Sequence, residues 1–151
     1  MTGAAACGCA VLGALRLWVD LTPDVVTHPS AVARTRLAQL RGDAFLTAAR
    51  SYLGQPSADS TLECRDTPDG RRPPEVLLEY RGTHPDLSRE KIGELATGAG
   101  WQVLDAGRTP TEMYSVNLGK SFEGWQSSAI VTVDPSTVTI ELDASADDSC
   151  P

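Results

Sequence analysis

Several signatures of catalytic and metal-binding proteins are missing from this 151-residue sequence. It has only two histidines, and no two cysteines have the CxxC spacing that is typical of zinc sites. The GxSxG turn of serine hydrolases and the GxxxxGK[ST] loop that holds phosphates are also missing. We therefore expect no catalytic residue, no metal and no cofactor, and we favour a protein that is not an enzyme.

Basic residues are in the minority. The chain has 13 Lys and Arg against 20 Asp and Glu, which gives a formal net charge of −7 at pH 7. Nucleic acids and anionic membrane surfaces are bound by basic patches. The charge therefore argues against nucleic acid as a partner and leaves an unknown protein or small molecule.

The most apolar stretch covers residues 4–19. It is too short to span a bilayer comfortably, Arg16 interrupts it, and no basic region precedes it as a secretory signal requires. We favour a signal or membrane-anchor remnant in residues 1–19, followed by a linker in residues 20–29. This places the protein at the membrane or outside the cell. The alternative is a frayed N-terminal helix of a cytoplasmic protein.

The four cysteines fall into two settings. Cys7 and Cys9 lie in the apolar N-terminal segment, Cys64 lies in a predicted strand, and Cys150 is the penultimate residue. If the domain is exported, Cys64 and Cys150 can form one long-range disulfide that ties the C-terminal tail to the sheet. The alternative is two unrelated thiols, and the sequence leaves both open.

Two segments have the apolar periodicity of helices. Residues 30–53 predict one long helix, with Ser30 as its N-cap. A second helix begins after Ser88, where Leu87 and Ile92 have the spacing of a hydrophobic staple. The apolar stripes of the two segments are Ala33, Leu37, Leu40, Ala44 and Ala48 in the first and Ile92, Leu95, Ala96 and Ala99 in the second.

Six segments predict strands: residues 61–65, 75–81, 101–104, 112–118, 125–133 and 138–142. Residues 66–74 are loop by composition, and Asp134 begins a tight turn between the last two strands. The order α-β-β-α-β-β-β-β, with short turns between strands, predicts an α+β domain. We expect an antiparallel sheet of about five to six strands, with both helices on one face. This domain covers residues 30–143, and an acidic tail covers residues 144–151.

Both histidines lie in a Thr-His-Pro tripeptide that leads into a predicted helix, at His28 and at His84. A shared metal or proton site would need carboxylate ligands or an orienting partner, and no spacing supplies them. A residue before proline is held extended, which helps to aim the next helix. We therefore interpret both tripeptides as helix-start devices.

Other candidate functional residues have simpler interpretations. Glu75 and Glu79 share one strand face and resemble an acid pair, but alternating carboxylates on an exposed strand usually serve solvation. Asp147 and Asp148 resemble a cation site, but a mobile acidic tail is the simpler explanation. Trp101 and Trp125 are expected in the core or at the sheet edge, with ligand stacking as the alternative.

The second half of the chain resembles a protein family. The segments SREKIGELATGAGW, YSVNL, WQSSAIVTV and TVTIEL are similar to small uncharacterised exported or membrane-anchored proteins of actinobacteria, in which a helix ending in Gly-Trp precedes short strands. The resemblance implies an extracytoplasmic α+β domain behind an N-terminal anchor, without catalytic residues.

These observations lead to three hypotheses about function. The first is a noncatalytic binding or interaction module that is secreted or tethered to the membrane. The second is a small hydrolase or ligand-binding protein with a pocket between helix and sheet, where a titratable group with a shifted pKa is expected. The third is a cytoplasmic partner protein with an exposed apolar patch on residues 4–19.

Overall fold

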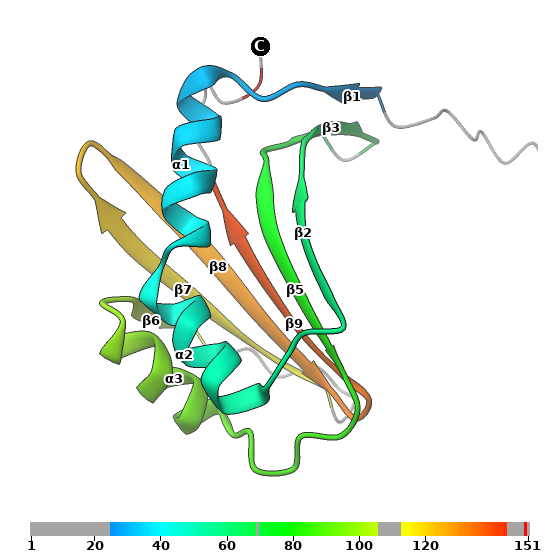
Figure 1. The fold of residues 1–151 in the computed structure, drawn as a ribbon, viewed down its shortest axis with the longest axis vertical. Helices are drawn as coiled ribbons and strands as arrows, with labels where there is room; N and C mark the ends of the chain where they lie inside the picture. The colour runs from blue at the N-terminus through cyan, green and yellow to red at the C-terminus, as the bar shows by residue number, and fades with distance from the viewer. Residues whose placement is uncertain (1–24, 69, 106–112, 145–149, 151) are drawn as a thin grey trace, which may run out of the picture.

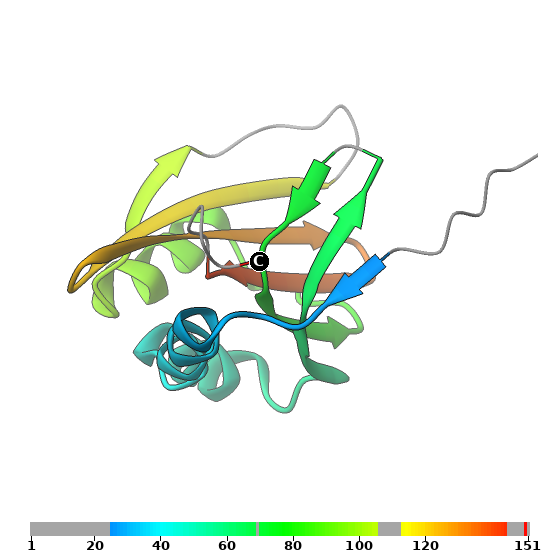
Figure 2. The same cartoon turned by 90° about the horizontal axis from the view of Figure 1, so that it is seen from above.

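The computed structural model describes residues 25–68, 70–105, 113–144 and Cys150. In these residues the chain has an α+β fold, with helices packed on one face of a six-stranded antiparallel sheet (Figure 1, Figure 2). The predicted fold class is therefore confirmed. A three-stranded sheet, which the sequence analysis did not predict, lies at one end of the large sheet (Figure 1).

The elements have the following bounds. The helices are α1 (Ala31–Arg41), α2 (Ala44–Leu53) and α3 (Arg89–Gly98). In spatial order, the large sheet contains β2 (Ala58–Leu62), β5 (Glu75–Arg81), β9 (Thr137–Asp143), β8 (Trp125–Asp134), β7 (Tyr114–Phe122) and β6 (Gln102–Asp105). The small sheet contains β1 (Val25–Thr27), β3 (Cys64–Thr67) and β4 (Gly70–Arg72).

The single long helix predicted for residues 30–53 is wrong: the segment forms α1 and α2. Gly42 ends α1: its N–H donates to the Ala38 carbonyl at 3.2 Å, and the N–H of Asp43 donates to the Leu40 carbonyl at 3.0 Å. Asp43 then caps α2, because its carboxylate accepts a hydrogen bond from the Phe45 N–H at 2.8 Å. The predicted cap at the start of the segment is confirmed, since the Ser30 hydroxyl accepts from the Ala33 N–H at 3.1 Å.

The strand predicted for residues 61–65 is also divided. Leu62 ends β2 in the large sheet, and Cys64 begins β3 in the small sheet, so the chain changes sheets at this point. The predicted loop at residues 66–74 contributes β4, and the predicted linker at residues 20–29 contributes β1. Both short strands pair with β3, which explains why they form despite weak local patterns.

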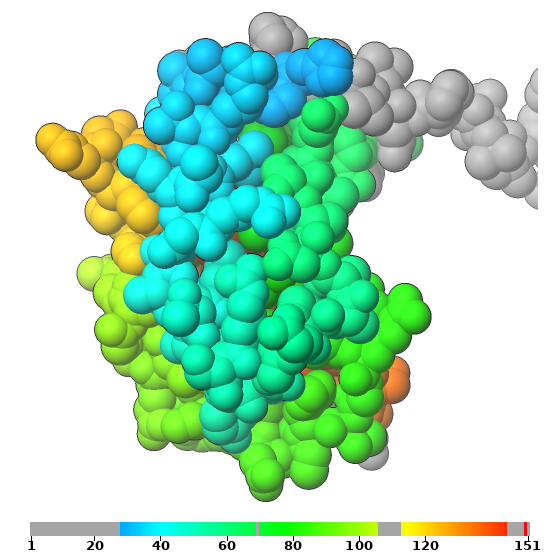
Figure 3. Space-filling model, in the orientation of Figure 1, coloured from blue at the N-terminus to red at the C-terminus, as the bar shows by residue number. Residues whose placement is uncertain are grey.

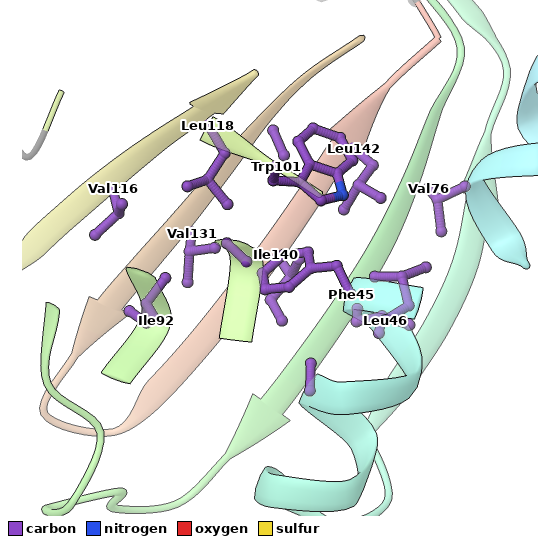
Figure 4. Close-up of a cluster of buried hydrophobic side chains, with 14 of the residues drawn as sticks. Phe45, Leu46, Val76, Ile92, Trp101, Val116, Leu118, Val131, Ile140 and Leu142 are labelled. Atoms are coloured by element: carbon purple, nitrogen blue, oxygen red, sulfur yellow. The ribbon is translucent and has the colours of Figure 1, made fainter. Parts of the chain in front are cut away.

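The hydrophobic core lies between the helices and the sheet (Figure 4). Alternate residues of each central strand face the helices and are buried, as the period of a strand requires. On β8 these are Ala129, Val131 and Val133. Figure 4 shows Phe45 of α2 and Ile92 of α3 meeting strand side chains in this layer. From the same side, the space-filling view in Figure 3 shows the helices over the middle of the sheet.

Cys64 and Cys150 form a disulfide, with 5.8 Å between their Cα atoms. Of the two alternatives left open by the sequence, the structure therefore shows the linked one. The bond ties the C-terminal tail to the small sheet, where the Arg71 guanidinium also donates to the Cys150 carbonyl at 3.2 Å. Cys7 and Cys9 lie outside the described residues, as do the predicted anchor at residues 1–19 and the acidic pair Asp147 and Asp148.

None of the helices in the described part of the chain is long and apolar enough to cross a membrane.

Candidate functional site

The two histidines lie at opposite ends of the large sheet. His28 follows β1, which is joined through the small sheet to the start of β5, whereas His84 follows the end of β5 (Figure 1). The ends of this seven-residue strand are about 20 Å apart, at roughly 3.3 Å per residue. A shared histidine site is therefore excluded by the geometry.

The helix-start interpretation is confirmed at both positions by the caps that follow the tripeptides. The Ser88 hydroxyl accepts from the Lys91 N–H at 3.1 Å, as Ser30 does at α1. Leu87 and Ile92 are both buried in the core, which fits the predicted staple. The hydroxyls of Tyr52 and Tyr114 add support by donating to backbone carbonyls of the loop before α3.

His84 lines a hollow of about 300 Å³ together with Tyr52 and residues of its own loop. Its Nε2 atom is buried and has no hydrogen-bond partner among the described residues. General-base catalysis needs an imidazole oriented by a partner and placed beside a reactive group. That combination is not found here in the described residues, so we do not assign a catalytic site to this hollow. His28 is 90% exposed and lies 3.3 Å from the Glu63 carboxylate.

The tryptophans do not offer surfaces for ligand stacking. Trp101 is 1% exposed and donates its indole N–H to Asp43 at 2.9 Å. Trp125 stacks on Phe122, with ring centroids 4.4 Å apart, and the Arg36 guanidinium lies 5.2 Å from its ring centroid. Trp125 is half-buried and packs against the hydrophobic core. The expected packing role is therefore confirmed for both side chains.

A buried ion pair on the helix-covered side was missed by sequence reasoning. The Asp43 carboxylate lies 2.6 Å from the Lys120 ammonium, and their side chains are 3% and 18% exposed. Lys120 also donates to the Ala99 carbonyl at 2.7 Å. The pair joins the start of α2, the end of α3 and β7. Because both charges are already satisfied, we interpret it as a structural cluster.

The other face of the large sheet, which we call the open face, is not covered by helices and is turned away from the viewer in Figure 1. Its residues are those that alternate with the core residues. On β8 they include Ser128, Ile130 and Thr132, and Ile130 is 42% exposed. Two hollows on this face differ in charge.

The first hollow has a volume of about 220 Å³, and we call it the acidic hollow because its three carboxylates outnumber Arg72, the positive residue in its described lining. Its carboxylates come from β5 and β9, where Glu75 lies directly opposite Asp143 and Glu141 is two residues further along. Burial and the negative charge of Glu75 raise the pKa of Glu141 above its usual range. Glu75 itself accepts a hydrogen bond from Arg65 at 2.8 Å.

The suspected acid pair of Glu75 and Glu79 is not found. Glu75 pairs with Arg65, whereas Glu79 pairs with Arg81 on its own strand at 2.7 Å. Each carboxylate is thus neutralised by a different arginine. Within the described residues, no cluster of three or more His, Cys, Asp or Glu side chains is suited to hold a metal ion.

The second hollow is larger, at about 420 Å³, and lies on β6, β7 and β8. Gly119 is at its centre, because this residue is paired with Gln102 on one side and Ser128 on the other. A Cβ atom on Gly119 would lie 3.1 Å from Leu104 Cδ1, so the missing side chain lets Leu104 lie against the strand at this point. Ser121 and Gln126, which pair with each other, complete its polar wall.

No family model matches the chain, and no curated protein matches it significantly. The resemblance to exported actinobacterial proteins therefore stays a prediction. What the site can do has to be argued from its own residues.

Proposed function

We propose that the chain is a noncatalytic, extracytoplasmic binding module that contacts its partner through the open face of the six-stranded sheet. The observation that carries this proposal is the contrast between the two faces. Helices and a closed hydrophobic core cover one face, whereas the other has exposed polar side chains and two hollows. Concave surfaces with a few polar groups are where binding proteins take their ligands.

The Cys64–Cys150 disulfide supports the extracytoplasmic part of the proposal. Disulfides persist in oxidising compartments, whereas the cytosol keeps thiols reduced in most organisms. The N-terminal segment of residues 1–19 is the proposed attachment to the membrane, and a secreted form without an anchor is the alternative. Both fit the disulfide equally well.

Site-specific photo-crosslinking in the native host tests the proposal. A benzophenone amino acid replaces Ser128 on the open face or, as a matched control, the exposed Ser51 on α2. We expect crosslinked products from position 128 and none from position 51. Thiol trapping of the same fractions should show Cys64 and Cys150 oxidised in the extracytoplasmic fraction. Equal crosslinking from both positions, or reduced cysteines in the cytosol, would contradict the proposal.

A second candidate function, a small acid–base enzyme, is favoured by one observation in the acidic hollow. Glu141 has a raised pKa, while Glu75 beside it is held in an ion pair with Arg65. Two carboxylates in different environments can divide the roles of acid and base. This candidate requires turnover of a glycoside or ester that the Glu141→Gln variant abolishes, whereas a binding module shows no turnover.

A further inference from the structure

We propose that the hollow over Gly119 binds an uncharged, hydrogen-bonding ligand of the class of neutral saccharides. This inference rests on the proposed function, because it names the ligand class of the same open face. It concerns the larger hollow on β6, β7 and β8 and not the acidic hollow on β5, β8 and β9, with which it shares Ser128.

The polar wall of the hollow consists of groups that both donate and accept hydrogen bonds. Gln102 and Gln126 contribute carboxamides, and Ser121 and Ser128 contribute hydroxyls. All four residues are exposed, and among the described residues their side chains make no hydrogen bond within the chain. The hollow thus presents unused donors and acceptors on two opposite sides of Gly119. Hydroxyl groups, which also donate and accept, are the complementary chemistry.

Charge narrows the ligand class further. Among the described residues that line this hollow, Lys120 alone has a charged side chain, and its ammonium points to the helix-covered side, where Asp43 and the Ala99 carbonyl hold it. A phosphate or carboxylate in the hollow would therefore lose water without gaining a free counter-charge, which is unfavourable. An amine would meet no carboxylate among the described residues that line this hollow, since Asp143, opposite Ser128, belongs to the acidic hollow. A neutral ligand avoids both costs.

The Leu104 side chain gives the hollow an apolar floor. Leu104 is 64% exposed and lies against Gly119, where a Cβ atom would be 3.1 Å from its Cδ1 atom. A sugar ring has C–H groups on its faces and hydroxyls at its edge, so it can lie on this floor with its hydroxyls toward the polar wall. The volume of about 420 Å³ falls within the range of about 300 to 1,000 Å³ that small-molecule sites have.

Titration of the full-length, disulfide-linked protein by ¹⁵N–¹H NMR tests the inference. The probes are cellobiose and N,N′-diacetylchitobiose, with digalacturonate as the charged comparison and trialanine amide as the peptide comparison. We expect the neutral disaccharides to shift the amide signals of residues 102, 119, 121, 126 and 128, with a Kd of about 1 to 10 mM. Digalacturonate should bind at least about tenfold more weakly.

Two variants separate this hollow from the rest of the face. Gly119→Val displaces the Leu104 side chain from the floor and should weaken saccharide binding at least about tenfold, because its Cβ atom would lie 3.1 Å from Leu104 Cδ1. Gln126→Ala, at an exposed position, should weaken binding by about threefold to tenfold without disturbing the fold. Thr139→Val lies on the open face outside this hollow and should leave binding unchanged.

The possible failures are distinguishable. If neither disaccharide shifts these signals at about 20 mM, or if Gly119→Val binds as the wild type does, the inference is overturned. If trialanine amide binds in place of the sugars, the saccharide class is wrong, but binding through the open face stands. Equal photo-crosslinking from positions 128 and 51 contradicts the proposed function itself, whatever the sugars do.

Discussion

Strand β8 shows how differently the two faces of one sheet can be used. Ala129 and Val131 face the helices and are each 1% exposed, whereas Ile130 between them faces the other way and is 42% exposed. Apolar side chains thus lie on both faces of the strand, but only those on the helix-covered side are removed from water. Burial of such side chains is the main source of stability. Residues on the open face contribute less to stability, so they can serve binding instead.

One ion pair from each face shows the same difference, although the Arg65–Glu75 pair of the open face, at 29% and 12% exposed, lies between the two. Asp43 and Lys120, on the helix-covered side, have side chains that are 3% and 18% exposed. Glu79 and Arg81, on the open face, have side chains that are 29% and 77% exposed. A pair in water gains little net stability, whereas a buried charge that loses its partner is costly. The comparison predicts that replacing a paired carboxylate by alanine lowers the free energy of unfolding more on the helix-covered side than on the open face.

The largest effect is expected from Asp43→Ala. This variant removes the N-cap of α2 and the acceptor for Trp101, and it leaves the Lys120 ammonium without its carboxylate. We expect the free energy of unfolding, measured with urea, to fall by about 3 to 5 kcal/mol. Glu79→Ala is the matched control on the open face, with an expected loss below about 1 kcal/mol. Similar losses from both variants would show that the two faces do not differ as we argue.

The second-largest effect is expected from the loss of the disulfide in the small sheet, which belongs to neither face of the large sheet. The double variant Cys64→Ala/Cys150→Ala opens a link between residues 86 positions apart. A link over such a long loop restricts the unfolded chain, so its loss should lower the free energy of unfolding by about 2 to 4 kcal/mol. Reduction should shift the urea midpoint of the wild-type protein to that of the variant and leave the variant unchanged. Equal midpoints for oxidised and reduced wild type would contradict this prediction.

The elements that the sequence predicts well are those with a strong local pattern. β5, β8 and β9 alternate apolar and polar residues, and α3 has a Ser cap with a hydrophobic staple. The predicted ends of helices and strands were wrong where contacts between distant parts of the chain determine where an element ends. The apolar stripe continues across Gly42 and Asp43, so the break there was not expected, although Gly followed by Asp is a reasonable pair of helix stop and helix cap.

The candidate site was less predictable than the fold. Asp43 and Lys120 are 77 residues apart in the chain, and only the complete fold brings the start of α2 and β7 together. The hollow over Gly119 depends on the register that places Gln102 and Ser128 on either side of it. Register between distant strands is set by the whole sheet. No local pattern around Gly119 could therefore have identified the hollow.

The smallest effect is expected from Glu141 on the open face, because the folded state disfavours the charged form of its carboxylate. Burial and Glu75 raise the pKa of Glu141 in the folded chain, so the folded state binds a proton at pH values where the unfolded chain has lost it. The free energy of unfolding should therefore fall as the pH rises from the unfolded pKa of Glu141 through the folded one. Glu141→Gln removes this charge, so it should be more stable than the wild type at pH 7.

The gain of Glu141→Gln over the wild type should shrink as the pH falls below the folded pKa of Glu141, because both side chains are then neutral. Urea unfolding at a series of pH values measures this gap. Glu123→Gln, at an exposed position in the turn between β7 and β8, is the control for the exchange of a carboxylate for a carboxamide in water. If Glu141→Gln is instead less stable than the wild type at pH 7, the charged form of Glu141 has a stabilising partner in the acidic hollow. The open face would then share the structural role that we assign to the helix-covered face alone.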